Sequence, residues 1–134
     1  TDASGAIEVT SSGTVDTATV GTYTITYSAT DASGNAATQV TRTVTVVDTT
    51  APIVVVTGDN PATVELGTSY TDAGATATDA SGDVTVVTTG TVDVDTLGSY
   101  TITYTSTDAS NNSGTATRVE TRYQQNLAQL RSAR

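Results

Sequence analysis

The chain has 134 residues and a formal net charge of −9, and it contains no Cys, Met, Trp, Phe or His. All 5 of its basic residues are Arg, so disulfides, thiol nucleophiles, Cys-ligated zinc, imidazole bases and lysine chemistry are excluded. The acidic balance argues against nucleic acid and anionic membranes as partners, and it leaves hard, oxygen-ligated cations open. No apolar run approaches the ~20 residues of a membrane-spanning helix, so we expect no membrane insertion.

The composition also predicts the fold class. Thr and Val are abundant, and both favour strands because a branched Cβ fits a pleated sheet. Gly, Asp, Asn and Ser supply turns between the strands. The sequence therefore predicts an all-β protein with many short strands.

A long internal repeat organises the chain. When Thr1–Thr38 is placed on Thr78–Thr115, 23 of 38 aligned positions are identical, which indicates tandem copies of one module. A polar linker ending in Pro, Asp48–Pro52 (DTTAP), separates the copies. We therefore expect residues 1–48 to be the second half of a module whose first strands are missing, residues 49–122 to be a complete module, and residues 123–134 to be a tail.

Alternation and turn residues predict the strands of the complete module in chain order. They are Ile53–Thr57, Ala62–Leu66, Ser69–Thr78, Val84–Thr89, a short strand or crossover at Thr91–Asp95, then Ser99–Thr107 and Thr115–Arg122. The loops Asp79–Asp83 and Asp108–Gly114 connect them. Seven short strands at this spacing are typical of an immunoglobulin-like Greek-key β-sandwich.

One local pattern fixes the expected orientation of a strand. In immunoglobulin domains a Tyr lies two residues before a buried core position, and its hydroxyl bonds back to the preceding corner. Tyr100 and Ile102 fit this pattern, and Tyr23 and Ile25 repeat it in the first copy. Together with Tyr27 and Tyr104 further along the same faces, we interpret these rings as corner and core packing.

Three segments carry a family resemblance: the linker Asp48–Pro52, then Val64–Ala77 (VELGTSYTDAGATA) and Gly21–Asn35 (GTYTITYSATDASGN). With them the chain resembles bacterial immunoglobulin-like repeats, related to hyalin repeats, of large surface adhesins and secreted proteins. The second copy departs from the pattern where Asn111-Asn112 replaces Gly34-Asn35.

The resemblance implies an extracellular location on the bacterial surface and a role other than catalysis. The leading interpretation is a structural spacer of an adhesin or surface fibre. The alternative is an accessory module that positions substrate for a secreted hydrolase. We interpret the rows of outward-facing Thr as ordinary strand residues. Because the module has no Trp, we do not expect it to bind carbohydrate.

A calcium site is the main chemical candidate. The start of the first strand and two loops of a sandwich meet at one end, and a preceding module presents its opposite end there. Carboxylates gathered at such a junction repel one another unless a cation bridges them. The candidate ligands are Asp48, Asp79, Asp83, Asp108 and Asp16. The competing interpretation is that these Asp residues cap their own turns.

The partial module predicts a partner. Residues 1–48 alone leave unpaired sheet edges and an open core, so we expect them to be disordered or to be complemented by strands of a neighbouring immunoglobulin-like repeat in the same or another chain. The tail is expected to be frayed or to form one short helix, with Tyr123, Leu127 and Leu130 on one face.

Overall fold

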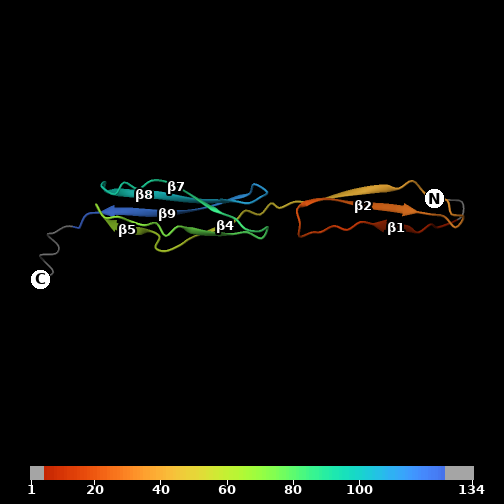
Figure 1. Cartoon of the computed structure of the whole chain (residues 1–134), viewed down its shortest axis with the longest axis horizontal. Coiled ribbons are helices and arrows are strands. Elements are labelled where there is room, and N and C mark those ends of the chain that lie inside the picture. Colours follow the sequence, from red (N-terminus) through yellow and green to blue (C-terminus); the bar gives the residue numbers. More distant parts are fainter. Residues whose placement is uncertain (1–4, 126–134) are drawn as a thin grey trace. The chain divides into compact units, whose positions relative to one another are not determined.

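Nine β-strands form the regular structure of residues 5–125, the part of the chain that the computed structural model describes (Figure 1). No helix occurs in this range, which confirms the all-β prediction. The chain divides into two units, Thr1–Asp48 and Thr49–Arg134.

The first unit is one antiparallel sheet of three strands. The strands β1 (Val9–Ser12), β2 (Gly21–Ala29) and β3 (Val40–Val46) lie in the order β1-β2-β3. None of its residues from 5 to 48 is fully buried, so this sheet has no closed core within the described chain.

The second unit contains two sheets. One pairs β4 (Ile53–Val56) with β6 (Ala75–Thr78), and the other has the order β5-β9-β8-β7. The strands of the larger sheet are β5 (Ala62–Glu65), β7 (Val86–Thr89), β8 (Gly98–Thr107) and β9 (Ser113–Tyr123). β5 runs parallel to β9, and the other pairings are antiparallel. This arrangement confirms the immunoglobulin-like sandwich.

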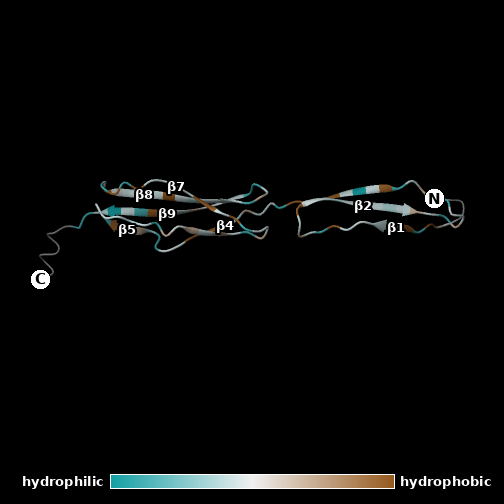
Figure 2. Cartoon of the chain, in the orientation of Figure 1, coloured by the Kyte–Doolittle hydropathy of each residue, from teal (hydrophilic) through white to brown (hydrophobic). Residues whose placement is uncertain are grey.

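The interior of the second unit is unusually polar. Ile102 and Tyr104 alternate along β8 and are 5% and 0% exposed, as expected for the inward face of a strand. The inward face of β9 instead carries charged residues, and Figure 2 shows the hydrophilic bands along this strand. The buried charged residues of β9 are Arg118, Glu120 and Arg122.

Several strand boundaries differ from the sequence predictions by one or more residues. The predicted strand Ser69–Thr78 is regular only from Ala75, because Gly74 has a φ of 75° that no extended strand adopts. Thr91–Asp95, predicted to be a short strand or a crossover, is not a strand, since Asp93 accepts the backbone N–H of Asp95 in a turn.

β9 is longer at both ends than predicted and ends at Tyr123. Tyr123 therefore belongs to the sheet and not to a helix. The rest of the predicted helical stripe, Leu127 and Leu130, lies outside the described residues.

Candidate functional site

Each unit contains a tyrosine corner of the predicted form. The Tyr23 hydroxyl donates to the carbonyl of Thr19 at 2.8 Å, and the Tyr100 hydroxyl donates to the carbonyl of Thr96 at 2.9 Å. Both bonds tie the start of a central strand to the turn that precedes it. The repeat in sequence is thus a repeat in structure.

Asp16 is held inside the corner of the first unit. Its carboxylate accepts the N–H of Ala18 at 2.9 Å and the hydroxyl of Thr19 at 2.7 Å. The hydrogen bond from Thr19, followed by that from Ala18, lowers the pKa of Asp16. Asp93 occupies the same place in the second unit and accepts the hydroxyl of Thr96. Both Asp residues cap their own turns.

Asp108 organises the loop between β8 and β9. It is 7% exposed, and its two carboxylate oxygens accept the N–H groups of Ser110 and Asn112 and the side-chain amide of Asn112, each at 2.8 Å. Burial alone would raise the pKa of Asp108, but these hydrogen bonds outweigh it and hold the pKa below its usual range.

The same loop in the first unit explains the departure from the family pattern. Asp31 accepts the N–H groups of Ser33 and Asn35 there. Gly34 has a φ of 87° and Asn111 a φ of 69° at the matching position. Asn is among the few residues that adopt this left-handed conformation readily, so the loop is preserved.

Asp79 and Asp108 bring two loops of the second unit together. A carboxylate oxygen of Asp79 lies within 4.8 Å of a carboxylate oxygen of Asp108. Asp79 accepts the backbone N–H of Ser81 at 2.7 Å through one oxygen, while its second oxygen, Oδ2, is buried and has no hydrogen-bond partner among the described residues. Two carboxylates this close are stabilised when a cation lies between them.

The remaining predicted ligands have different surroundings. Asp83 is exposed at the far end of its loop. Asp16 lies in the first unit, at the end of the sheet where Gly21 pairs with Val46. Asp48 is the last residue of the first unit and stands four positions before Pro52, which is buried in the second.

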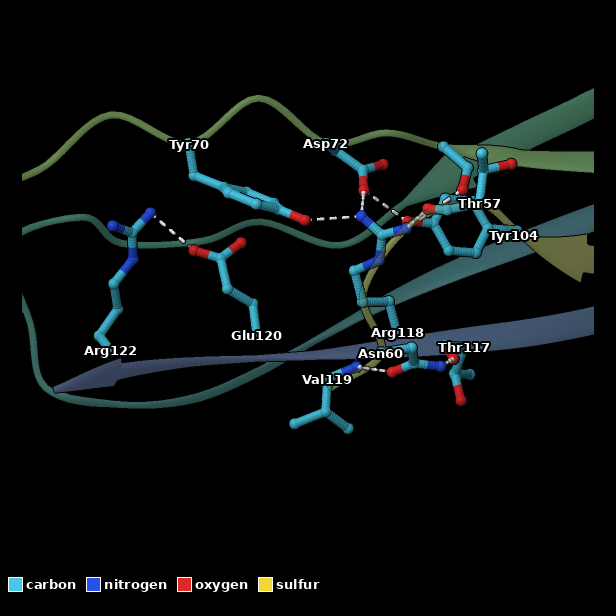
Figure 3. A network of polar contacts seen from close by, with 11 residues as sticks. Thr57, Asn60, Tyr70, Asp72, Tyr104, Thr117, Arg118, Val119, Glu120 and Arg122 are labelled. Atoms are coloured by element: carbon cyan, nitrogen blue, oxygen red, sulfur yellow. Dashed lines mark hydrogen bonds and ion pairs between the residues drawn. The ribbon is translucent and has the colours of Figure 1, made fainter. Parts of the chain in front are cut away.

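A second polar cluster, centred on Arg118, was not predicted from the sequence (Figure 3). The Arg118 side chain is fully buried, and one guanidinium nitrogen donates to the Tyr70 hydroxyl at 2.6 Å and to Asp72 at 2.7 Å. The other donates to the carbonyls of Thr57 and Gly74. Arg118 thereby joins β9 to the segments that flank the opposite sheet.

Tyr104 completes this cluster. Its hydroxyl donates to Asp72 at 2.7 Å, and the Arg118 guanidinium carbon lies 5.9 Å from the ring centroid. Burial, together with the hydrogen bond and the negative charge of Asp72, raises the pKa of Tyr104 to about 12. Tyr104 therefore remains a donor throughout the physiological pH range.

Glu120 and Arg122 form a second buried ion pair on the same strand. Their side chains are 0% and 1% exposed and lie 2.7 Å apart. Arg122 also donates to the carbonyl of Thr68 at 2.7 Å. A signal existed in the sequence, since charged residues alternate at positions 118, 120 and 122, but alternation alone does not say which face of a strand is buried.

Comparison with known proteins agrees with this geometry. The model of the family described as "Bacterial surface protein, Ig-like domain" matches residues 1–46 and 54–120. No individual curated protein matches the chain. No helix within residues 5–125 is long and apolar enough to cross a membrane. The paired sheets, the two tyrosine corners and this match together show that the chain belongs to the bacterial surface protein Ig-like domain family.

Proposed function

We propose that this chain is a structural spacer of an extracellular bacterial adhesin or surface fibre, and that it acts by bearing tension. The family to which it belongs is one of bacterial surface proteins. The observation that supports a mechanical role is the parallel pairing of β5 with β9 in the second unit.

A parallel pair formed by a strand near the start of a unit and the strand at its end resists stretching. Ala62 pairs with Glu120 and Glu65 with Tyr123, so both strands run in the same direction. A force that pulls the linker side and the C-terminal side apart slides β5 and β9 in opposite directions along their axes. The hydrogen bonds of the ladder are then loaded together, whereas an antiparallel hairpin pulled at its open end loses them one at a time.

Side chains extend the connection beyond this ladder. The Asn60 amide donates to the carbonyl of Thr117 at 2.8 Å and accepts the N–H of Val119 at 3.1 Å, so it pairs with β9 just before β5 begins. Arg122 bonds to the Thr68 carbonyl just after β5 ends. Both contacts must break when the strands slide.

Single-molecule stretching tests this proposal. The second unit should unfold in one event that releases roughly 25 nm of chain, as residues 49–123 extend. Thr63→Pro and Val64→Pro are both tested, because only alternate residues of β5 donate a backbone hydrogen bond to β9. One of the two variants therefore removes a donor of the ladder. That variant should unfold at a clearly lower force.

Val87→Pro in β7 is the matched control, because the β7–β8 ladder lies outside the loaded pair. Extension of the wild-type unit without a force peak would overturn the mechanical role. Equal loss of force in the control and in both β5 variants would show general destabilisation instead.

We further propose that calcium locks the junction between modules, with Asp48 joining Asp79 and Asp108 as ligands. The support is the closeness of the Asp79 and Asp108 carboxylates and the buried Asp79 oxygen that lacks a hydrogen bond within residues 5–125. Hard cations such as Ca²⁺ take oxygen ligands of this type.

Thermal unfolding with millimolar calcium, and with magnesium for comparison, measures this binding. Calcium at a hundred times its dissociation constant should raise the Tm on the order of 10 °C. Asp48→Asn and Asp79→Asn should each abolish most of the rise in Tm. Asp83→Asn should retain the rise, because Asp83 lies in the same loop as Asp79 but is exposed. A Tm that calcium leaves unchanged would reduce these residues to ordinary turn caps.

A further inference from the structure

We propose that Asn111 is a site of N-linked glycosylation, with the sugar supplied by a donor that is activated as a diphosphate. The chain is the acceptor in this reaction, and a glycosyltransferase of the bacterium is the catalyst. Asn111-Asn112-Ser113 is the one triplet of the sequence with the Asn-x-Ser/Thr pattern. The proposal goes beyond the spacer function and does not depend on it.

The triplet lies in the loop between β8 and β9 and at the start of β9, where Asn111 and Ser113 are exposed. The first unit shows how much room this loop has. A Cβ built on Gly34, at the position that matches Asn111, would meet no atom within 4 Å. A side chain at this position can therefore extend away from the fold, where a second protein can reach it.

The fold uses the backbone of Asn111 but not its carboxamide. The N–H of Asn111 donates to the carbonyl of Asp108 at 3.2 Å, whereas its side chain makes no hydrogen bond within residues 5–125. Asn112 differs, because its side-chain amide donates to the Asp108 carboxylate at 2.8 Å. Of the two adjacent Asn residues, Asn111 is thus the one whose amide nitrogen is available to an enzyme.

The shape of the loop does not require a side chain at this position. Asn111 has a φ of 69°, and Gly34 has a φ of 87° in the matching loop. Gly adopts this left-handed conformation without steric cost, and Asn adopts it less readily than Gly. The second repeat therefore carries a carboxamide that its own loop does not need, which leaves this group for an interaction outside the fold.

The reaction joins the amide nitrogen of Asn111 to the anomeric carbon of the sugar. The bond from that carbon to a phosphate oxygen of the donor breaks, and the diphosphate leaves with the electron pair. The amide proton passes to the transferase and then to solvent. Ser113 provides the hydroxyl that the triplet requires two positions after the acceptor, and this hydroxyl lies 2.7 Å from that of Thr107.

Mass spectrometry of the full chain recovered from the surface of the bacterium tests the proposal. Cleavage after each Arg yields the peptide 43–118, which should carry a sugar on Asn111. A single hexose would identify a nucleotide-sugar donor, and an oligosaccharide would identify a lipid-linked donor. An unmodified peptide would overturn the proposal.

Two substitutions in the triplet should each remove the added mass completely. They are Asn111→Gly and Ser113→Ala, which introduce the residues that Gly34 and Ala36 provide at the matching places of the first repeat. The loop should keep its shape in both variants, because Asp108 and its hydrogen-bonding partners are unchanged. Added mass that survives Asn111→Gly would contradict the assignment.

The first repeat offers a matched gain of the site. Gly34→Asn combined with Ala36→Ser builds the same triplet around Asn35, in a loop with the same hydrogen bonds. This variant should carry a second sugar, on the peptide 1–42. Ala36→Ser alone should leave that peptide unmodified, because it creates no Asn-x-Ser/Thr triplet.

Discussion

At the residue scale, the second unit depends on one buried guanidinium. Arg118 reaches Tyr70, Asp72 and the carbonyls of Thr57 and Gly74, so its charge is neutralised and most of its donors are used. A buried pair of this kind contributes little relative to an apolar pair of the same volume, but removal of one partner is costly. The stability of the unit is therefore sensitive to the loss of Asp72.

Asp72→Ala should lower the free energy of unfolding by about 2–3 kcal/mol, because it leaves the Arg118 charge buried without its carboxylate. Asp72 is partly exposed, with 26% of its side chain accessible, so the loss is smaller than for a fully buried partner. Urea denaturation measures the change. Asp83→Ala, at an exposed site, is the control, and equal stability of both variants would refute the role assigned to Asp72.

Glycine is required at one turn that both repeats share. A Cβ on Gly90 would lie 2.5 Å from the carbonyl oxygen of Thr101, and one on Gly13 would lie 2.4 Å from that of Thr24. Both glycines also have positive φ, 108° and 104°. The turn can therefore approach the central strand only where no side chain is present.

At the element scale, β3 and β9 show two solutions for the same strand. Val44 pairs with Tyr23, and at the matching place Glu120 pairs with Tyr100. Val46 pairs with Gly21, and at the matching place Arg122 pairs with Gly98. The second repeat therefore has an ion pair at the two positions where the first repeat has valines. Arg122 also donates a hydrogen bond to the carbonyl of Thr68 at this end of the unit.

This comparison predicts non-additive substitutions in β9. Arg122→Met should destabilise the second unit by about 3 kcal/mol or more, because Glu120 then remains buried and unpaired. The double variant Glu120→Leu with Arg122→Met should be more stable than the single one, since no buried charge is left. Thermal and urea unfolding of the wild-type chain, of the single variants Arg122→Met and Glu120→Leu, and of the double variant tests this. A double variant that loses the sum of both single effects would contradict it.

At the scale of the whole molecule, the two units differ in how completely they are closed. The second unit places two sheets face to face and buries Ile102, Tyr104 and the charged residues of β9 between them. The first unit has the same central strands but no second sheet, and no residue from 5 to 48 is fully buried. We expect the second unit to unfold cooperatively.

The sequence by itself determined the fold class, the repeat and the tyrosine corners. These depend on local chemistry: branched residues favour strands, Asp and Gly favour turns, and identical segments fold alike. Tyr23 and Tyr100 could be assigned because their bonds span only four residues. The strand ends at Gly74 and Asp93 were less predictable, since turn chemistry there overrides the alternation.

Only the tertiary structure decided which charges are buried and which carboxylates meet. Asp72 and Arg118 are 46 positions apart, and the bond between them depends on how the two sheets pack. Asp79 approaches Asp108 because two loops meet at one end of the sandwich, while Asp83, in the loop of Asp79, stays exposed. Such contacts depend on long-range packing, which the pattern of residues along a single strand does not contain.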